Sequence, residues 1–244
     1  MKQQVVFQDL GAMRYREAWD YQESLLQENV AIKSEARRRE NEQLTDNNSQ
    51  LEIVAETKHH LLFVEHPPVY TLGKSGDMAN VLLSEENLKV RGIDFYRTNR
   101  GGDITFHGPQ QIVGYPILDL EKFYTDIGKY LRNIEEVTIQ TLAEYGIKGE
   151  RSQGETGVWI DPDIKGRERK ICAIGVRSSR WITMHGFALN VNTDLNYFNF
   201  IIPCGIQQKQ VTSIEKELGQ KVDFEEAKEK VKRNFEKVFD VEIV

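Results

Sequence analysis

Two apolar runs joined by a short polar turn constrain the fold of this chain more than any other feature. The first reads KICAIGV over residues 170–176, and the second reads WITMHGFALNV over residues 181–191. Short apolar runs rich in β-branched and aromatic residues are typical of buried strands. Because only the polar sequence RSSR lies between them, we predict a hairpin, and we expect a sheet to be organised around it.

A cysteine follows this hairpin in the sequence Pro203-Cys204-Gly205. Proline fixes its backbone φ angle whereas glycine leaves φ free, so this tripeptide predicts a tight corner. Such a corner could hold the thiol at the mouth of a cleft. Two interpretations are open for Cys204: a nucleophile that needs activation, or a structural residue.

The free energies involved narrow how Lys170 could activate this thiol. A thiol with a pKa of ~8.5 is only a few per cent thiolate at neutral pH. Lowering that pKa to ~7 takes roughly 2 kcal/mol, which one nearby ammonium can supply. Making a lysine neutral at pH 7 would instead cost about 4.6 kcal/mol. If Lys170 partners Cys204, we therefore expect it to act as a cation that stabilises the thiolate.

The composition excludes several classes of protein. With 244 residues, 39% of them hydrophobic and 29% charged, the chain is typical of a globular protein with a sizeable core. The net charge of −6 argues against nucleic acid as a bulk electrostatic partner. Two cysteines are too few for a disulfide framework. Without a signal-peptide apolar region or a membrane-spanning run, we expect a cytoplasmic protein.

The N-terminal part predicts a helix followed by a polar insertion. Apolar residues between Tyr15 and Val30 recur at helical spacing, and we expect the helix to end among the charges of EARRRE. Residues 40–52 are polar and lack periodicity, which predicts a surface loop within an insertion near residues 33–56. The arginines at 37–39 are either a solvated helix end or a docking patch.

The rest of the chain alternates strand and helix patterns. We predict strands over residues 5–8, 59–65, 95–98, 111–120 and 156–160, and helices opening at Ser84, over 123–145, and after a capping Asp223. The basic turn at 165–169 is either a solvated hairpin tip or a landing patch for an acidic partner.

Two motifs suggest a metal site and a phosphate-binding loop, but the spacing of their residues does not match either kind of site. His59, His60 and His66 would suggest a metal site, but adjacent histidines on a strand point to opposite faces, and no acidic or thiol partner stands at ligand spacing. The sequence TLGKSG at 71–76 lacks the full GxxxxGK[ST] spacing of a phosphate-binding loop.

The sequence RGGDITFHGP at 100–109 is more informative. Two glycines after Arg100 allow the backbone to approach a ligand closely. A turn at Gly108-Pro109 would fix His107. The alternative is a glycine-rich hairpin with a buried, hydrogen-bonded histidine.

Several stretches together resemble one family. In chain order they read HPPVYTLG, RGGDITFHGP, QIVGYPILDL, TGVW, KICAIGVRSSRWITMHGFALNV and FIIPCGI. They resemble the octanoyl-[acyl-carrier-protein]:protein octanoyltransferases, also called lipoyl(octanoyl) transferases, from about Phe7 to Ile214. The resemblance implies an α+β protein with the biotin/lipoate protein-ligase fold, a mixed and largely antiparallel sheet flanked by helices. Residues 1–244 would form a single domain.

The resemblance also implies a reaction and its partners. Octanoyl moves from the phosphopantetheine thioester of acyl carrier protein to a cysteine, and then to a specific lysine of a lipoyl domain. Acceptors would be the lipoyl domains of 2-oxoacid dehydrogenase complexes and the H protein of glycine cleavage. No nucleotide, metal, nucleic acid or membrane takes part, and we expect a monomer. Alternatives are an ATP-dependent lipoate-protein ligase or a lipoyl-protein amidotransferase of the same fold.

Carried onto this sequence, the family's site residues fall as follows. The acyl-thioester nucleophile falls on Cys204, and the lysine that lowers its pKa falls on Lys170. The acyl-binding pocket falls on Arg100, Gly101, Gly102, Asp103, Ile104, Thr105, Phe106, His107, Ala173, Ile174, Gly175, Gly186, Phe187 and Ala188. Two groups could receive the proton of the acceptor lysine: Lys170 after acylation, or a water held by His107.

The chain departs from the family pattern at two positions besides the long insertion. Gln110 stands where the family usually has glycine in HGPG, which would alter the pocket rim. Cys172 stands where a small residue such as alanine or serine is usual. By strand alternation Cys172 would share a face with Lys170 and lie near Cys204, where oxidation could pair the two thiols. The alternative is a small buried thiol.

Overall fold

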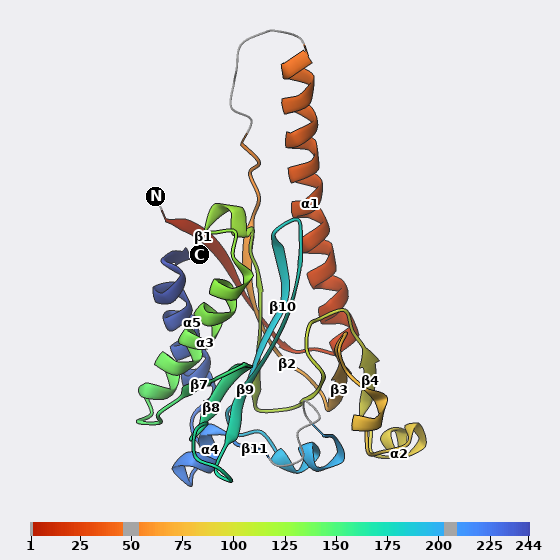
Figure 1. The fold of residues 1–244 in the computed structure, drawn as a ribbon, viewed down its shortest axis with the longest axis vertical. Helices are drawn as coiled ribbons and strands as arrows, with labels where there is room; N and C mark the ends of the chain where they lie inside the picture. Colours follow the sequence, from red (N-terminus) through yellow and green to blue (C-terminus); the bar gives the residue numbers. More distant parts are fainter. Residues whose placement is uncertain (1, 46–53, 203–208) are drawn as a thin grey trace.

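The predicted hairpin lies at the centre of the larger sheet (Figure 1). It consists of β9 (Arg169–Ser179) and β10 (Ile182–Asn190), paired antiparallel. The structure, a computed structural model, describes residues 2–45, 54–202 and 209–244. Within these residues, nine strands form one sheet in the order β12-β1-β2-β6-β10-β9-β8-β7, with β11 beside β9.

The remaining strands complete a mixed sheet. Their bounds are β1 Gln3–Ala12, β2 His59–Glu65, β6 Gln111–Ile117, β7 Glu150–Ser152, β8 Glu155–Ile160, β11 Gln210–Val211 and β12 Val241–Ile243. β1 runs parallel to β2 and to β12, and β11 runs parallel to β9. The other pairs are antiparallel, so the predicted mixed, largely antiparallel sheet is confirmed.

A second, three-stranded sheet supports the loop that begins at Arg100. It comprises β3 (Val69–Leu72), β4 (Asp94–Arg97) and β5 (Ile104–His107), in the order β4-β3-β5. The glycine-rich loop joins β4 to β5, and the chain passes from β5 directly into β6 of the large sheet. The two sheets therefore meet beside this loop.

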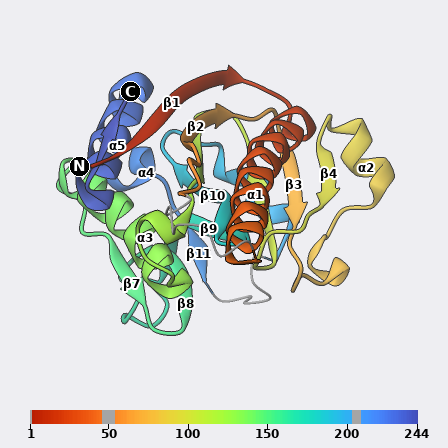
Figure 2. The ribbon, with the colours of Figure 1, turned by 90° about the horizontal axis from the view of Figure 1, so that it is seen from above.

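Helices cover both faces of the large sheet, as Figure 2 shows from above. α1 (Tyr15–Thr45) packs on one face, and α3 (Ile127–Ala143) and α5 (Phe224–Phe239) pack on the other. Successive side chains of a strand point to opposite faces. On β10, Phe187 and Leu189 accordingly join the core under α3 and α5, whereas Ala188 joins the core under α1.

The shorter helical segments lie at the ends of strands. They are α2 (Glu85–Val90), α4 (Ile214–Leu218) and the 3₁₀ helices η1 (Met78–Asn80), η2 (Leu120–Lys122) and η3 (Leu195–Phe200). The predicted caps of α2 and α5 are confirmed, since Ser84 and Asp223 each accept a hydrogen bond from a backbone N–H three residues on. α3 begins later than predicted because Asp126 caps it.

The predicted surface loop at 40–52 is wrong up to Thr45, because α1 continues to that residue. Ion pairs at helical spacing support the continuation: Arg38 contacts Glu35 at 2.9 Å and Glu42 at 3.1 Å. Such pairs stabilise exposed helices without any apolar periodicity. The last turns of α1 project beyond the body of the molecule (Figure 1). The remainder of the expected loop, residues 46–53, lies outside the described residues.

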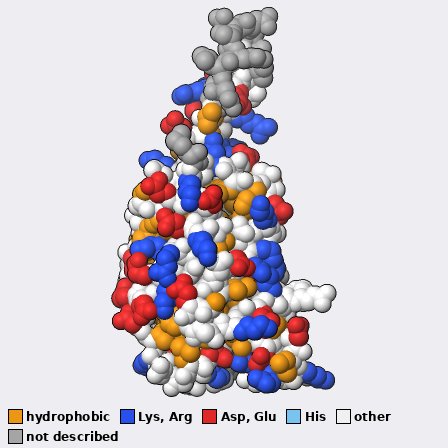
Figure 3. Space-filling view, turned by 90° about the vertical axis from the view of Figure 1, so that its left-hand side faces the viewer, with side chains coloured by type: hydrophobic (Ala, Val, Ile, Leu, Met, Phe, Trp, Pro, Cys, Tyr) orange, Lys and Arg blue, Asp and Glu red, His pale blue; other side chains and the backbone are white. Residues whose placement is uncertain are grey.

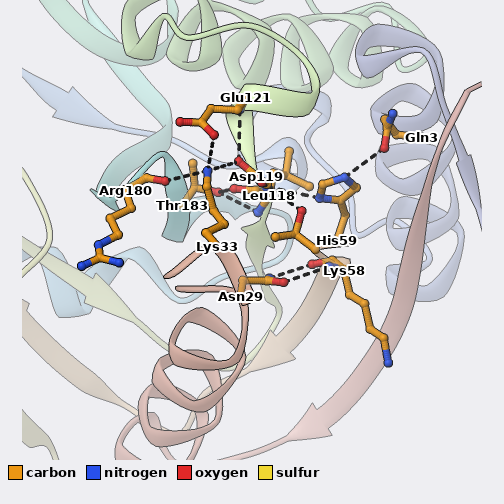
Figure 4. Close-up of polar contacts among 11 residues, drawn as sticks. Gln3, Asn29, Lys33, Lys58, His59, Leu118, Asp119, Glu121, Arg180 and Thr183 are labelled. Carbon is orange, nitrogen blue, oxygen red and sulfur yellow. Dashed lines mark hydrogen bonds and ion pairs between the residues drawn. The ribbon is translucent and has the colours of Figure 1, made fainter. Parts of the chain in front are cut away.

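A buried ion pair anchors α1 where it leaves the sheet (Figure 4). Nζ of Lys33 lies 2.7 Å from a carboxylate oxygen of Asp119 and 2.8 Å from Glu121, and it donates to the carbonyl of Arg180 at 2.9 Å. Only 1% of the Asp119 side chain is exposed. The backbone N–H of Asp119 donates to Nδ1 of His59, which is itself buried. These contacts fix the base of the projecting segment.

Both basic stretches make ion pairs within the chain. In the stretch 37–39, Arg38 and Arg39 pair with Glu35. In the turn 165–169, Arg167 and Arg169 pair with Asp161. On the face drawn in Figure 3, basic and acidic side chains are interspersed. These observations favour the solvated interpretation of both stretches. None of the described helices is long and apolar enough to cross a membrane.

Candidate active site

A cavity of about 330 Å³ lies between the β9–β10 hairpin and the loop that begins at Arg100. Most residues predicted to bind the acyl group line it: Arg100, Gly102, Asp103, Ile104, Thr105, His107, Ala173, Ile174, Gly175, Gly186, Phe187 and Ala188. Lys170 lines it as well. The structure thus brings the hairpin together with the loop that begins at Arg100, which is far from it in the sequence.

Gly101 and Phe106 are the predicted residues that do not line the cavity. The Phe106 side chain packs in a separate apolar cluster, where its ring stacks on that of Tyr197 with centroids 4.6 Å apart. Thr105 and His107, on the other face of β5, line the cavity, whereas Ile104 packs in the same cluster as Phe106 and also reaches the cavity. Gly101 instead donates its N–H to the carbonyl of Val176, which holds the loop against β9.

Two glycines of the hairpin are needed for close packing around the cavity. A Cβ on Gly175 would lie 2.8 Å from the carbonyl oxygen of Gly101 and 3.1 Å from Cδ of Arg100. A Cβ on Gly186 would lie 2.1 Å from the carbonyl oxygen of Gly114. Glycine at these positions therefore lets the Arg100 loop lie against β9 and lets β10 lie close to β6.

The inner wall of the cavity is polar and tightly hydrogen-bonded. The Arg100 guanidinium donates to the carbonyl of Thr71 at 2.5 Å and to its hydroxyl at 2.9 Å. Nδ1 of His107 lies 2.9 Å from Oε1 of Gln111. Burial, with His66 and Arg100 nearby, holds the pKa of His107 well below its ordinary value. His107 is therefore both a buried, hydrogen-bonded histidine and a residue of the cavity wall.

Two lysines and an indole ring lie at another part of the cavity. Nζ of Lys170 is 4.5 Å from the centroid of the Trp159 ring, and Nζ of Lys209 is 4.8 Å from it. Lys209 also forms an ion pair with Glu155 at 2.5 Å. Although burial acts to raise the pKa of Glu155, hydrogen bonds from Lys209 and Ser152 hold it below its ordinary value. Among the described residues, this part of the cavity wall therefore carries the side chains of Lys170 and Lys209 and the carboxylate of Glu155.

Cys204, predicted as the nucleophile, lies outside the described residues, as does Gly205. The described chain on either side of them reaches the cavity, since Phe198 and Lys209 both line it. β11 then runs beside β9, with Val211 paired to Lys170.

Comparisons with known proteins show the family of the chain. A family model described as the lipoyl protein ligase A/B catalytic domain matches residues 14–236. An octanoyltransferase of Christiangramia forsetii is 55% identical over 244 residues, covering 100% of this chain and 99% of the relative. An octanoyltransferase of Flavobacterium psychrophilum is 56% identical over 245 residues and covers all of both chains. The chain belongs to the octanoyltransferase family.

Solved structures confirm the predicted fold. A bi-partite lipoate protein ligase from Thermoplasma acidophilum superposes with a TM-score of 0.65 at 16% identity, covering 100% of this chain and 86% of that one. A lipoate-protein ligase A bound with ATP gives a TM-score of 0.66 at 14% identity, with 100% and 88% covered. The octanoyltransferase therefore has the fold of the biotin/lipoate protein ligases.

Cys172 does not share a face with Lys170, contrary to the prediction. A register shift between β8 and β9 pairs Val158 with Cys172 but Trp159 with Lys170. Ile171 is the additional residue on β9, and such a bulge breaks simple alternation. The buried Cys172 thiol lies 3.6 Å from the hydroxyl of Thr138 on α3. Because Cys204 lies outside the described residues, the predicted proximity of the two thiols stays a prediction.

Gln110 lies away from the cavity and does not form its rim. Its backbone has a φ of 62°, in the left-handed region that glycine adopts most easily. This conformation explains why the family usually has glycine in HGPG. The side chain of Gln110 accepts a hydrogen bond from Asn192 at 2.8 Å.

Sequence reasoning missed several residues that line the cavity. Tyr15, Gln111, Trp159, His185 and Asn190 all line the cavity. A signal was available for the last two, because His185 and Asn190 are polar residues within an otherwise apolar strand. Tyr15, at the first residue of α1, carries no such signal.

Proposed function

We propose that this octanoyltransferase moves an octanoyl group from acyl carrier protein to a specific lysine of a lipoyl domain through a thioester on Cys204. One observation carries the proposal: Lys170 and both described flanks of the Cys204 segment line the same cavity. The acceptors would be lipoyl domains of 2-oxoacid dehydrogenase complexes and the H protein of glycine cleavage.

The first step exchanges one thioester for another. The Cys204 thiolate attacks the carbonyl carbon of the donor thioester, and the phosphopantetheine sulfur leaves and takes up a proton. Lys170 as an ammonium would stabilise the thiolate before attack, since a neighbouring cation lowers a thiol pKa. In the second step the acceptor lysine amine attacks the Cys204 thioester, forms an amide and loses a proton, and the cysteine sulfur leaves.

The apolar side of the cavity suits an unbranched acyl chain. Ile104, Ile174, Phe187 and Ala188 contribute apolar lining, and Gly175 leaves backbone at the wall. Each methylene buried contributes ~0.8 kcal/mol, so the whole chain would supply several kcal/mol of affinity. The reaction needs no nucleotide, because the donor thioester already carries the activation.

The preferred acyl donor distinguishes the proposed transferase from an ATP-dependent lipoate-protein ligase and from a lipoyl-protein amidotransferase. An apo lipoyl domain is incubated with the enzyme and one of three donors: octanoyl-acyl carrier protein without ATP, free octanoate with ATP, or an octanoylated H protein. The proposal expects the first donor to be used best, as measured by the mass of the acceptor. A preference for octanoate with ATP would identify a ligase, and a preference for the H protein would identify an amidotransferase.

A further inference from the structure

A row of polar side chains runs along the cavity wall from Arg100 to the strand beside Lys170. Its members are Arg100, Thr71, His107, Gln111, Asn190 and the backbone of Thr212. These side chains are buried, so each hydrogen bond has a defined direction and each group has few alternative partners.

The end of the row at Thr212 fixes the orientation of two amides. Nδ2 of Asn190 donates to the carbonyl of Thr212 at 2.9 Å. Nε2 of Gln111 donates to the carbonyl of Phe106 at 3.1 Å and to Oδ1 of Asn190 at 2.8 Å. Backbone carbonyls only accept hydrogen bonds, so each amide must turn its NH₂ group toward them. Oε1 of Gln111 is therefore the atom that faces His107.

An amide oxygen also only accepts, which assigns the proton on one imidazole nitrogen. Oε1 of Gln111 lies 2.9 Å from Nδ1 of His107. Nδ1 must therefore carry a hydrogen and donate it to Gln111. In a neutral imidazole the other nitrogen, Nε2, is then an acceptor.

The opposite end of the row is satisfied by the same tautomer. Arginine only donates, and the Arg100 guanidinium donates to the hydroxyl oxygen of Thr71 at 2.9 Å. The Thr71 hydroxyl proton is then available for another acceptor. Nε2 of His107 lies 3.3 Å from that hydroxyl oxygen and accepts the proton.

We infer that His107 is a neutral positioning residue with its proton on Nδ1, and that it is not the base for the acceptor lysine. Both ring nitrogens are engaged by Thr71 and Gln111, which argues against a water held by His107. Resting on the function proposed above, this favours Lys170, of the two groups considered, as the acceptor of that proton. The tautomer itself follows from the contacts alone.

The groups around the ring oppose a second proton. Besides the uncharged Thr71 and Gln111, the titratable side chains that face His107 are Tyr15 on α1, His66 after β2, Arg100 in the loop and His185 on β10. None of these four carries a negative charge near neutral pH, and Arg100 is a cation. A doubly protonated His107 would lie beside that cation in a buried site, which is costly.

The row also couples the two ends of the cavity. The N–H of Thr212 donates to the carbonyl of Lys170 at 2.9 Å, and the carbonyl of Thr212 accepts from Asn190. The position of β11 beside Lys170 is thus tied through Asn190 and Gln111 to His107. Gln111 and Asn190 thus connect His107 to the backbone of Lys170, a connection that sequence patterns did not suggest.

The tautomer is tested directly by ¹⁵N NMR of the histidine side chains at neutral pH, with His107 assigned by comparison with His107→Asn. We expect one imidazole whose Nδ1 is protonated and whose Nε2 is an acceptor. An Nε2-protonated ring or an imidazolium would overturn the inference. This measurement needs no turnover, so it stands apart from any failure of the proposed function.

Two substitutions separate positioning from base catalysis. Asparagine at 107 places an NH₂ group near the position of Nδ1, whereas glutamine places its amide near Nε2, and neither can take a proton at neutral pH. We expect His107→Asn to keep activity within about tenfold of the parent and His107→Gln to lose on the order of a hundredfold. If His107 were the catalytic base, both variants would lose activity alike, by roughly 10²–10⁴-fold. Equal losses of that size, with unchanged melting temperatures, would contradict the inference.

Discussion

Replacing the side-chain nitrogen of Gln111 by oxygen should destabilise the folded protein. Its Nε2 donates to two oxygens and its Oε1 accepts from His107, and only 1% of the residue is exposed. Gln111→Glu would turn two donors into acceptors that face oxygen. We expect a loss of roughly 3 kcal/mol or more in the free energy of unfolding, measured by urea denaturation.

The matched control is Gln8→Glu. The Oε1 of Gln8 accepts a hydrogen bond from the Tyr21 hydroxyl at 2.8 Å, and a carboxylate can accept that bond equally well. We expect a change within about 0.5 kcal/mol. If Gln111→Glu and Gln8→Glu lower the free energy of unfolding equally, the direction of the hydrogen bonds at Gln111 does not determine its contribution to stability.

Cys172 should be chemically inert in the folded protein. Burial raises the pKa of its thiol to about 12, although a hydrogen bond from Thr138 acts in the opposite direction. Because the thiolate is the reactive form, we expect no alkylation of Cys172 at pH 8 until the protein unfolds. Peptide mass spectrometry after iodoacetamide treatment, with and without urea, measures this. Rapid alkylation without urea would show that α3 does not cover the thiol.

At the scale of elements, the central strands and the helices α2, α3 and α5 were predictable, whereas the end of α1 and the short strands β7, β11 and β12 were not. The strands 170–176 and 181–191 are apolar on both faces because helices cover both, and that pattern is visible in the sequence. The end of α1 was missed because charged ion pairs, not an apolar stripe, support it. The opposite facing of Lys170 and Cys172 depends on one bulge residue, Ile171, which alternation cannot reveal.

Some residues of the candidate site were likewise predictable from the sequence and others were not. The motif-bearing residues Arg100, His107 and Lys170 were found because their stretches resemble a family. Gln111 and Asn190 were not assigned roles, since only the folded chain brings the two amides together. Sequence motifs therefore indicate which stretches come together, whereas the direction of each hydrogen bond can be assigned only in the folded structure.

The anchor of α1 gives a prediction at this scale. Lys33→Met would leave Asp119 buried without its cation, and breaking such a pair costs about 3–5 kcal/mol. We expect a loss of that order in urea denaturation, with faster amide exchange in residues 34–45. Arg38→Met removes only exposed ion pairs and should cost less than about 1 kcal/mol. Equal costs for the two variants would contradict an anchoring role for Lys33.

For the whole molecule, buried histidines should make stability depend on pH. Burial lowers the pKa of His59 and of His66 to about 4 and that of His185 to about 3. The unfolded chain binds these protons near pH 6.5, so below that pH it binds more protons than the folded chain. Stability is therefore complete above pH 6.5 and falls as the pH is lowered toward 4.

We expect the free energy of unfolding to drop by about 1–2 kcal/mol per buried histidine between pH 6.5 and pH 5. Urea denaturation at the two pH values measures the drop, and His59→Gln should reduce it. A pH-independent free energy over this interval would mean that these histidines are not held neutral.

The proposed reaction requires that an acyl thioester form on Cys204, without ATP. The most direct measurement is the intact mass of the protein after mixing with octanoyl-acyl carrier protein, alongside Cys204→Ala and Cys172→Ala. We expect one octanoyl group on the parent and on Cys172→Ala, none on Cys204→Ala, and its discharge by an apo lipoyl domain. An adduct that survives in Cys204→Ala, or no adduct on any of the three while octanoate and ATP support lipoyl-domain modification, would contradict the proposed reaction.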